Sequence, residues 1–402
     1  MDMRDKQILR DLSKRFMEIA TSDEQKKANQ RMKDSNDLKM VRPPVLLDEI
    51  PWHEFQGEAD LQLICEDGFA RGIENCFRQA LYYKKYFKAD FIMLPEWRVH
   101  MAYQEAPLGI DRKMHYSSGG SGSMEDVLED ERVLEKVCEP HLIALPERDE
   151  ATVNALMDAL GDTMPVRLVG VDVQAFAFWD DISFLRGVEP IYEDMYDRPE
   201  YLHRIMEVLV RRAKARIDFI EEHMHVNPDP RWVHCTPGAV SGLAEDGLKA
   251  TWYRGMAQPF SCVSPAMFKE FELDYIKLLA ERFGYTYYGC CEPLDTRIEM
   301  LKTIKNLRKL GVSPWADEEK CAEQIRGDYV YARKPNPAHV ATRTDPAVIR
   351  AETEKTVKLC MKYGCQAEFV LKDITTVSHN PGNLMVWADT VKTVLDEYYD
   401  AE

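Results

Sequence analysis

Eight short apolar segments alternate with stretches of helical spacing along this chain, and each apolar segment ends in ionisable or sulfur-bearing residues. The segments are residues 44–49, 90–94, 165–171, 231–236, 284–289, 310–314, 328–333 and 366–371. Strands that alternate with helices predict a parallel sheet, and eight of them predict an α/β fold of the (β/α)8 TIM barrel type. An open doubly wound sheet is the alternative. The number of strands, and the lack of a Gly-x-Gly-x-x-Gly motif after the first one, argue against it.

The barrel prediction makes a single domain of residues 41–402, with one extension and one insertion. Residues 1–40 are charged, have helical spacing and lack the apolar run of a secretory signal, which predicts an N-terminal helical extension. Residues 101–150 form a long insertion after the second predicted strand. Residues 115–123 within it are mostly serine and glycine, which predicts a mobile loop over the barrel mouth. An inert surface insertion is the alternative.

Charge and cysteine content exclude several classes of partner. The chain has 69 acidic and 52 basic residues, which gives a formal net charge of −17. This negative charge disfavours nucleic acid and anionic membranes as partners. No run of 18 apolar residues occurs, so the sequence predicts no membrane-spanning helix. Ten cysteines without a secretory signal indicate the reducing cytoplasm, where thiols stay available as ligands. The sequence leaves the formation of a homodimer open.

Polar groups follow most of the predicted strands. In a (β/α)8 barrel the reacting groups lie at the C-terminal ends of the strands. The candidates at these ends are Asp48, Glu49, Glu96, Asp172, His234, Cys235, Cys290, Cys291, Glu292, Ser313, Lys334, Asn336, Lys372 and Asp373. We predict Asp48, Glu96 and Lys372 as catalytic residues. The alternative for many of the set is that they only cap helices.

The fifth predicted strand ends in a pair of cysteines followed by a carboxylate. Side chains alternate along a strand, so we expect Cys290 and Glu292 on one side and Cys291 on the other. A thiolate together with a carboxylate and further nitrogen or oxygen ligands suits Zn²⁺. His234 is the expected third ligand, and Asp373 is another. The alternative is that the cysteines are small buried apolar residues.

Several motifs in order resemble one known family. They are Arg42-Pro-Pro at the first predicted strand, residues 164–172 and 185–202, the Tyr-Gly-Cys-Cys-Glu of residues 288–292, and the Arg-Lys-Pro-Asn-Pro of residues 333–337. From about residue 40 onward the chain resembles the uroporphyrinogen decarboxylase superfamily, which also contains corrinoid-dependent methyltransferases. The resemblance is closer to the methyltransferase branch. Where the decarboxylases have an arginine-rich segment for the substrate carboxylates, residues 46–52 here are acidic and apolar.

The resemblance also implies a zinc site, but the residues depart from the family pattern. Methyltransferases of this branch hold zinc with a His-x-Cys pair at the fifth strand and a further cysteine near the last. Here Tyr288 stands in place of the histidine if Cys290 matches the cysteine, and Lys372 and Asp373 lie where the second cysteine is expected. We therefore expect a substitute ligand set, made of Cys290, Glu292, His234 and Asp373, with Cys291 as a weaker candidate.

The function implied by the resemblance is a zinc-dependent methyltransferase that acts with a corrinoid protein or cobalamin. It would move a methyl group between cobalt and a small substrate, such as a methoxylated compound or a methylamine. Aromatic residues near strand ends would suit a flat ring or a corrin face: Trp52, Trp97, Phe176, Phe178, Trp179 and Trp315. Two alternatives stay open, a metal-independent decarboxylase of a small carboxylic acid and a non-catalytic corrinoid- or tetrapyrrole-binding protein.

Overall fold

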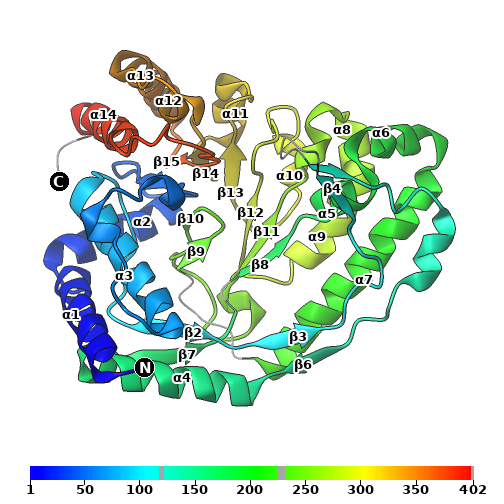
Figure 1. The fold of residues 1–402 in the computed structure, drawn as a ribbon. Coiled ribbons are helices and arrows are strands. Elements are labelled where there is room, and N and C mark those ends of the chain that lie inside the picture. Colours follow the sequence, from blue (N-terminus) through cyan, green and yellow to red (C-terminus); the bar gives the residue numbers. More distant parts are fainter. Residues whose placement is uncertain (117–121, 172, 225–230, 400–402) are drawn as a thin grey trace.

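The centre of the molecule is a parallel sheet of seven strands (Figure 1). The computed structural model describes residues 1–116, 122–171, 173–224 and 231–399. In spatial order the sheet strands are β1 (Val45–Leu47), β15 (Ala367–Leu371), β14 (Val330–Arg333), β13 (Leu307–Val312), β12 (Tyr285–Tyr288), β11 (Trp252–Gly255) and β8 (Val173–Phe176). Because all pairs are parallel, the C-terminal ends of these strands meet at one edge of the sheet.

Five of the eight predicted strands belong to this sheet, and three do not. Residues 90–94 form no strand and contact β1 through Asp90, whose backbone N–H donates to Val45 O. The predicted strand 165–171 contains β7 (Val166–Val169), which pairs with β2 (Trp97–His100) in a separate two-stranded sheet. Residues 231–236 fall in an antiparallel hairpin of β9 (Trp232–Val233) and β10 (Thr236–Pro237).

Two strands of the sheet, β8 and β11, were not expected. Both carry a long polar side chain at a buried position, Gln174 in β8 and Arg254 in β11, which breaks the apolar pattern of a buried strand. Within the described residues no eighth strand joins β1 to β8. The architecture is therefore a mixed α/β fold with a TIM-like parallel sheet whose closure into a barrel is not shown.

Helices lie around the strands of the molecule (Figure 1). They are α1 (Met3–Ala20), α2 (Asp23–Asn36), α3 (Gly68–Tyr86), α4 (Pro146–Leu160), α5 (Phe178–Arg186), α6 (Val188–Asp197), α7 (Pro199–His223), α8 (Pro265–Phe268), α9 (Asp274–Ala280), α10 (Ile298–Leu301), α11 (Glu318–Ile325), α12 (Ala338–Ala341), α13 (Pro346–Tyr363) and α14 (Gly382–Tyr398). The largest core cluster fills the space between the strands and the α5–α11 region. None of the helices in the described part of the chain combines the length and apolarity that crossing a membrane requires.

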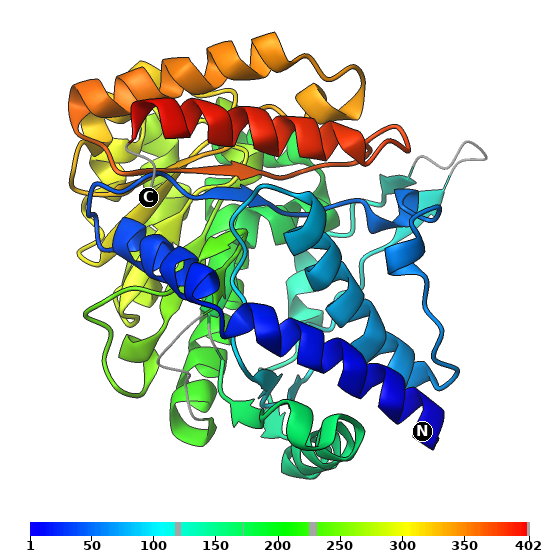
Figure 2. The same cartoon turned by 90° about the vertical axis from the view of Figure 1, so that its left-hand side faces the viewer.

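The N-terminal extension is helical, as predicted. Asp2 caps α1 by accepting the backbone N–H of Asp5, and Ser22 caps α2 in the same way through Gln25. Figure 2 shows α1 lying across α3 and beside α4. Phe16 of α1 and Phe77 of α3 meet edge to face with ring centroids 5.6 Å apart.

The insertion contains two small antiparallel sheets. β3 (Tyr103–Glu105) pairs with β6 (Leu142–Ala144), and β4 (Met114–Tyr116) pairs with β5 (Gly122–Met124). Glu105 binds Arg212 and Arg216 of α7, so the first of these sheets is attached to the helical layer. The glycine-rich part of the predicted mobile loop, residues 117–121, lies outside the described residues.

The hairpin β9–β10 is held on the inner side of the parallel sheet by a buried ion pair. Lys309 of β13 lies 2.9 Å from Glu368 of β15, and its ammonium also donates to Thr236 Oγ1 at 2.9 Å and to Pro237 O at 3.2 Å. Both charged side chains are almost completely buried. Because these bonds fix the base of the hairpin, its turn is directed to the C-terminal edge of the sheet, where His234 lies.

Candidate functional site

A glycine turn places Cys290 at the C-terminal end of β12. Gly289 has a φ of +107°, and a Cβ added there would lie 2.7 Å from Leu294 Cδ1 and 3.4 Å from the backbone of Gly311. Only glycine meets both conditions without strain. β12 ends at Tyr288, one residue before the predicted end, and Cys290 lies at the C-terminal edge of the sheet as expected.

Three side chains surround the Cys290 thiol, which is only 3% exposed. Lys372, which directly follows β15, places Nζ 3.2 Å from Cys290 Sγ. His234 Nε2 lies 3.7 Å from the same sulfur, and Sγ of the adjacent Cys291 lies 3.7 Å from it. The structure therefore brings His234 to Cys290, and a lysine ammonium is the nearest of the three partners.

Asp373 and Glu49 extend this cluster towards β1. Cys291 donates to Asp373 Oδ2 at 3.0 Å, and Asp373 Oδ1 lies 3.0 Å from Lys372 Nζ. The backbone N–H of Asp373 donates to Glu49 Oε2 at 2.7 Å. Glu49, His234 and Asp373 all have a positive φ, between 52° and 59°. Such backbone strain in non-glycine residues collects at functional sites.

Glu292 has a different place from the one expected. Its side chain is buried, and its carboxylate accepts the backbone N–H of Cys290 at 3.0 Å and that of Ala257 at 3.1 Å. Burial raises the pKa of this carboxyl. Glu292 therefore stabilises the turn that carries Cys290, while Cys291, expected to point away, contacts both Cys290 and Asp373.

The surroundings of Cys290 favour its thiolate. The contact with Cys291, followed by the one with His234 and by the charges of Lys334 and Lys372, lowers the pKa of Cys290 to about 2 against the opposing effect of burial. The contact with Cys290, together with burial, raises the pKa of Cys291. Burial lowers the pKa of His234 to about 4, so this imidazole is neutral at neutral pH.

The pKa of Lys372 shifts in the opposite direction to that of Cys290. Burial is the largest single effect and would lower the pKa of its ammonium, but the negative charges around it, with Cys290 first among them, together outweigh burial and raise the pKa. Lys372 and Cys290 therefore form a buried ammonium–thiolate pair. A thiolate that is paired with a cation is the reactive form of cysteine, both as a nucleophile and as a leaving group.

The described residues do not form a metal centre as they are arranged. Across these parts of the chain, no group of three or more histidine, cysteine, aspartate and glutamate side chains is arranged to hold a metal ion. The Lys372 ammonium lies closer to the Cys290 sulfur than His234 does. A metal ion bound to that sulfur would have to displace the Lys372 ammonium. The Glu292 carboxylate is used by backbone donors. Zinc therefore stays a prediction from the residue types at the strand ends and from the resemblance.

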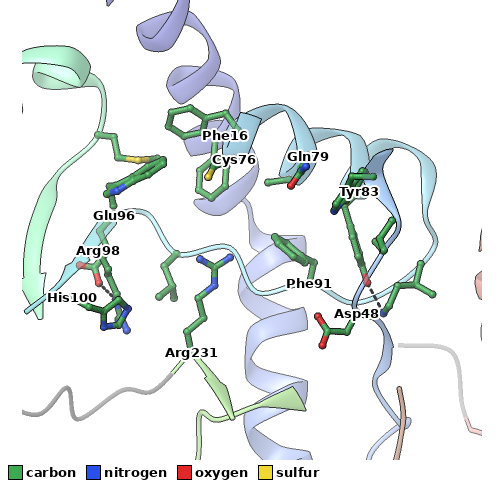
Figure 3. A pocket seen from close by; sticks show the side chains of 18 of the residues that line it. Phe16, Asp48, Cys76, Gln79, Tyr83, Phe91, Glu96, Arg98, His100 and Arg231 are labelled. Atoms are coloured by element: carbon green, nitrogen blue, oxygen red, sulfur yellow. Dashed lines mark hydrogen bonds and ion pairs between the residues drawn. The ribbon is translucent and has the colours of Figure 1, made fainter. Parts of the chain in front are cut away.

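A cavity of about 410 Å³ lies beside this cluster and holds the other two predicted catalytic residues (Figure 3). Asp48 and Glu96 both line it, with Glu49, whose Oε1 is 3.9 Å from Lys372 Nζ. Glu96 is paired with Arg98 at 2.6 Å and Arg167 at 3.7 Å. Burial raises the pKa of Asp48.

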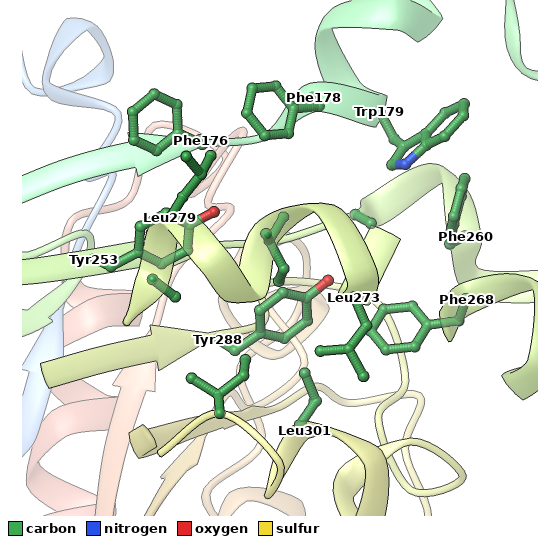
Figure 4. Close-up of a cluster of buried hydrophobic side chains, with 14 of the residues drawn as sticks. Phe176, Phe178, Trp179, Tyr253, Phe260, Phe268, Leu273, Leu279, Tyr288 and Leu301 are labelled. Carbon is green, nitrogen blue, oxygen red and sulfur yellow. The ribbon is translucent and has the colours of Figure 1, made fainter. Parts of the chain in front are cut away.

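The aromatic candidates separate into three groups. Trp52 and Trp97 line the cavity. Phe176, Phe178 and Trp179 pack in the main hydrophobic core with Tyr253 and Tyr288 (Figure 4), so the packing role explains them.

Trp315 forms the third group by itself, because it is 69% exposed.

Two residues near the thiolate were not predicted from the sequence. They are Tyr287, whose hydroxyl binds Lys334, and Arg254 of β11. An arginine and tyrosines within a buried strand are the signal that could have indicated them.

Comparison with known proteins adds a structural likeness only. No family model matches the sequence, and no curated protein matches it. Among solved structures, a methyltransferase from Methanosarcina mazei superimposes over 92% of this chain and 98% of its own, with 10% sequence identity and a TM-score of 0.48. A likeness of that degree carries no argument about the activity of this chain, which depends on the site itself.

Proposed function

We propose that this protein is a methyltransferase whose reaction is centred on Cys290. The observation that carries the proposal is the contact of 3.2 Å between Lys372 Nζ and Cys290 Sγ, which keeps a buried thiol ionised at the edge of the sheet. Sulfur is a strong nucleophile towards a methyl carbon once it is a thiolate. The adjoining cavity, with Asp48 and Glu49 at the end nearest this pair, would hold a small methylated substrate.

The chemistry follows from the groups present. Cys290 Sγ attacks the methyl carbon of a donor CH₃–X, so that the S–C bond forms while the C–X bond breaks and the electron pair leaves on X. Asp48 would give a proton to X from its neutral form, which burial favours. In the onward transfer, the electron pair of the acceptor forms a new bond to the methyl carbon while the S–C bond breaks and its electron pair returns to sulfur. Lys372 and the neutral His234 stabilise that thiolate, and a thiolate of low pKa is a better leaving group.

The methyl carrier proposed as partner is a corrinoid, bound to a second protein or free as cobalamin. Its cobalt would supply a centre that takes up and gives away methyl groups. The substrate on the other side is a small methoxylated compound or methylamine. These assignments are supported by the motif resemblance and by the contact of Lys372, the partner of the Cys290 thiolate, with Glu49 in the wall of the cavity at 3.9 Å. Zinc stays a prediction, with Cys290, Glu292, His234 and Asp373 as the predicted ligands and Cys291 as a weaker candidate.

The test follows the methyl group directly. Purified protein is incubated with methylcobalamin, and separately with reduced cobalamin and a panel of methoxylated acids and methylamines. We expect an S-methyl group on Cys290 by peptide mass spectrometry, and loss of cobalamin methylation in Cys290→Ala but not in Cys262→Ala, which changes an exposed thiol.

Three outcomes would contradict the proposal or part of it. Wild-type rates in Cys290→Ala would end the assignment of Cys290. Release of CO₂ from a carboxylic acid without any methyl transfer would favour the decarboxylase. One zinc per chain that is lost in Cys290→Ala would replace the ammonium–thiolate pair by a metal site.

A further inference from the structure

Two buried cations near Cys290 have no carboxylate partner in the described part of the chain. Arg254 is 4% exposed and Lys334 is 2% exposed. Among the described residues, no carboxylate oxygen lies within 4.0 Å of either charged group. Asp180 interacts electrostatically with Arg254, but both of its carboxylate oxygens accept hydrogen bonds from Gln258. Buried guanidinium and ammonium groups almost always have an anion beside them, because burial of an isolated charge is costly.

The contacts that these two cations do make are weak substitutes for a carboxylate. Arg254 directs one N–H to the sulfur of Met256, and its Nε has no hydrogen-bond partner within the described residues. Lys334 binds the Tyr287 hydroxyl and lies 3.4 Å from Gly289 O. All of these acceptors are neutral. Thioether sulfur is also a poor acceptor.

Strand alternation places both cations on the same side of the sheet as Cys290. Arg254 is paired in register with Tyr287, while Tyr253 and Tyr288 pack on the opposite side in the outer core (Figure 4). Lys334 reaches the Tyr287 hydroxyl from β14. Both charges act on His234, whose ring faces the Cys290 sulfur. Arg254, Lys334 and Cys290 therefore lie on the same side of the sheet.

We propose that Arg254 and Lys334 bind a carboxylate of the substrate, so that this protein acts on methylated compounds that carry an acid group. The inference rests on the proposed function for the reaction, but the carboxylate site is a binding property of its own. A carboxylate fits the donors because a guanidinium offers two parallel N–H groups and the ammonium a third. A dianion such as phosphate is less suited, because the Cys290 thiolate is already on the same side of the sheet.

Alkylation of Cys290 tests the carboxylate site without any methyl transfer. Iodoacetate and iodoacetamide are nearly the same size, and both form an S–C bond while iodide leaves, but only iodoacetate carries a carboxylate. The rate ratio of the two reagents is measured by peptide mass spectrometry at Cys290 and at the exposed Cys262 in the same sample. We expect the iodoacetate-to-iodoacetamide rate ratio to be at least about tenfold higher at Cys290 than at Cys262. The reason is that the free energy of hydrogen bonds to a charged group corresponds to a factor of about ten or more in binding.

Variants separate this site from a general attraction of anions to the thiolate region. Arg254→Gln should remove most of the preference, and Lys334→Met part of it. Arg132→Gln, which changes an exposed arginine, should leave the preference intact. In the wild-type protein, benzoate should slow the alkylation of Cys290 by iodoacetamide, and benzamide at the same ionic strength should not.

The outcomes decide between the two proposals. An equal ratio at Cys290 and Cys262, an unchanged ratio in Arg254→Gln, or a failure of both reagents to reach Cys290 would each overturn the carboxylate site. If Arg254→Gln does not fold, equal protection by benzoate and benzamide in the wild-type protein would do the same. A strong preference for iodoacetate without any S-methylation of Cys290 would keep the carboxylate site and reject the methyl transfer.

Discussion

Removal of the Lys372 charge should raise the pKa of Cys290, and the structure sets the size of the effect. The ammonium and the sulfur are 3.2 Å apart. Two unit charges at that distance attract each other by about 1.3 kcal/mol in water and by about 5 kcal/mol at an effective dielectric constant of ~20. These energies correspond to about one to four pKa units. The true value should lie towards the upper end, because both groups are almost completely buried.

The assay is the rate of Cys290 alkylation by iodoacetamide as a function of pH. Because the wild-type thiol has a pKa of about 2, its thiolate is fully formed and the rate should stay level through the neutral and mildly acidic range. In Lys372→Met the alkylation rate should fall as the pH falls, and the midpoint of this fall should lie about one to four pH units above that of the wild-type protein. Lys372→Arg keeps the charge and serves as the control. A Lys372→Met profile that overlies the wild-type profile would refute the ammonium–thiolate pair.

Three further predictions concern the groups that hold the site in place. Glu292→Ala should lower the free energy of unfolding by about 1–3 kcal/mol, because two buried backbone N–H groups lose their acceptor; an unchanged denaturant midpoint would contradict this role. Lys309→Met should cost about 3–5 kcal/mol by leaving Glu368 as an unpaired buried charge, and the double variant Lys309→Met/Glu368→Leu should recover most of that loss in a double-mutant cycle. Gly289→Ala should destabilise the fold by more than about 1 kcal/mol, since its φ is +107° and its Cβ would meet Leu294; thermal unfolding identical to wild type would show that the turn adapts.

Much of the fold follows from local patterns that the sequence displays. The N-terminal helices are expected from the charge and spacing of residues 1–40. Residues 231–236 show where this reasoning ends. The segment has the composition of a strand, but its pairing depends on Lys309, which is 73 residues away from Thr236 in the chain. Long-range contacts of that kind leave no trace in local periodicity.

The sequence by itself determined which chemistry is available at the site. Thiol, carboxyl and ammonium groups follow the strands, and parallel strands bring such ends to one edge. Only the tertiary structure decided how these groups are paired. It turned Glu292 to the backbone, brought Lys372 to Cys290 across 82 residues of chain, and left Arg254 without a carboxylate within the described residues. The physical reason is that pKa and coordination depend on separations of a few ångströms, which are set by how the strands, the hairpin and the Gly289 turn pack together.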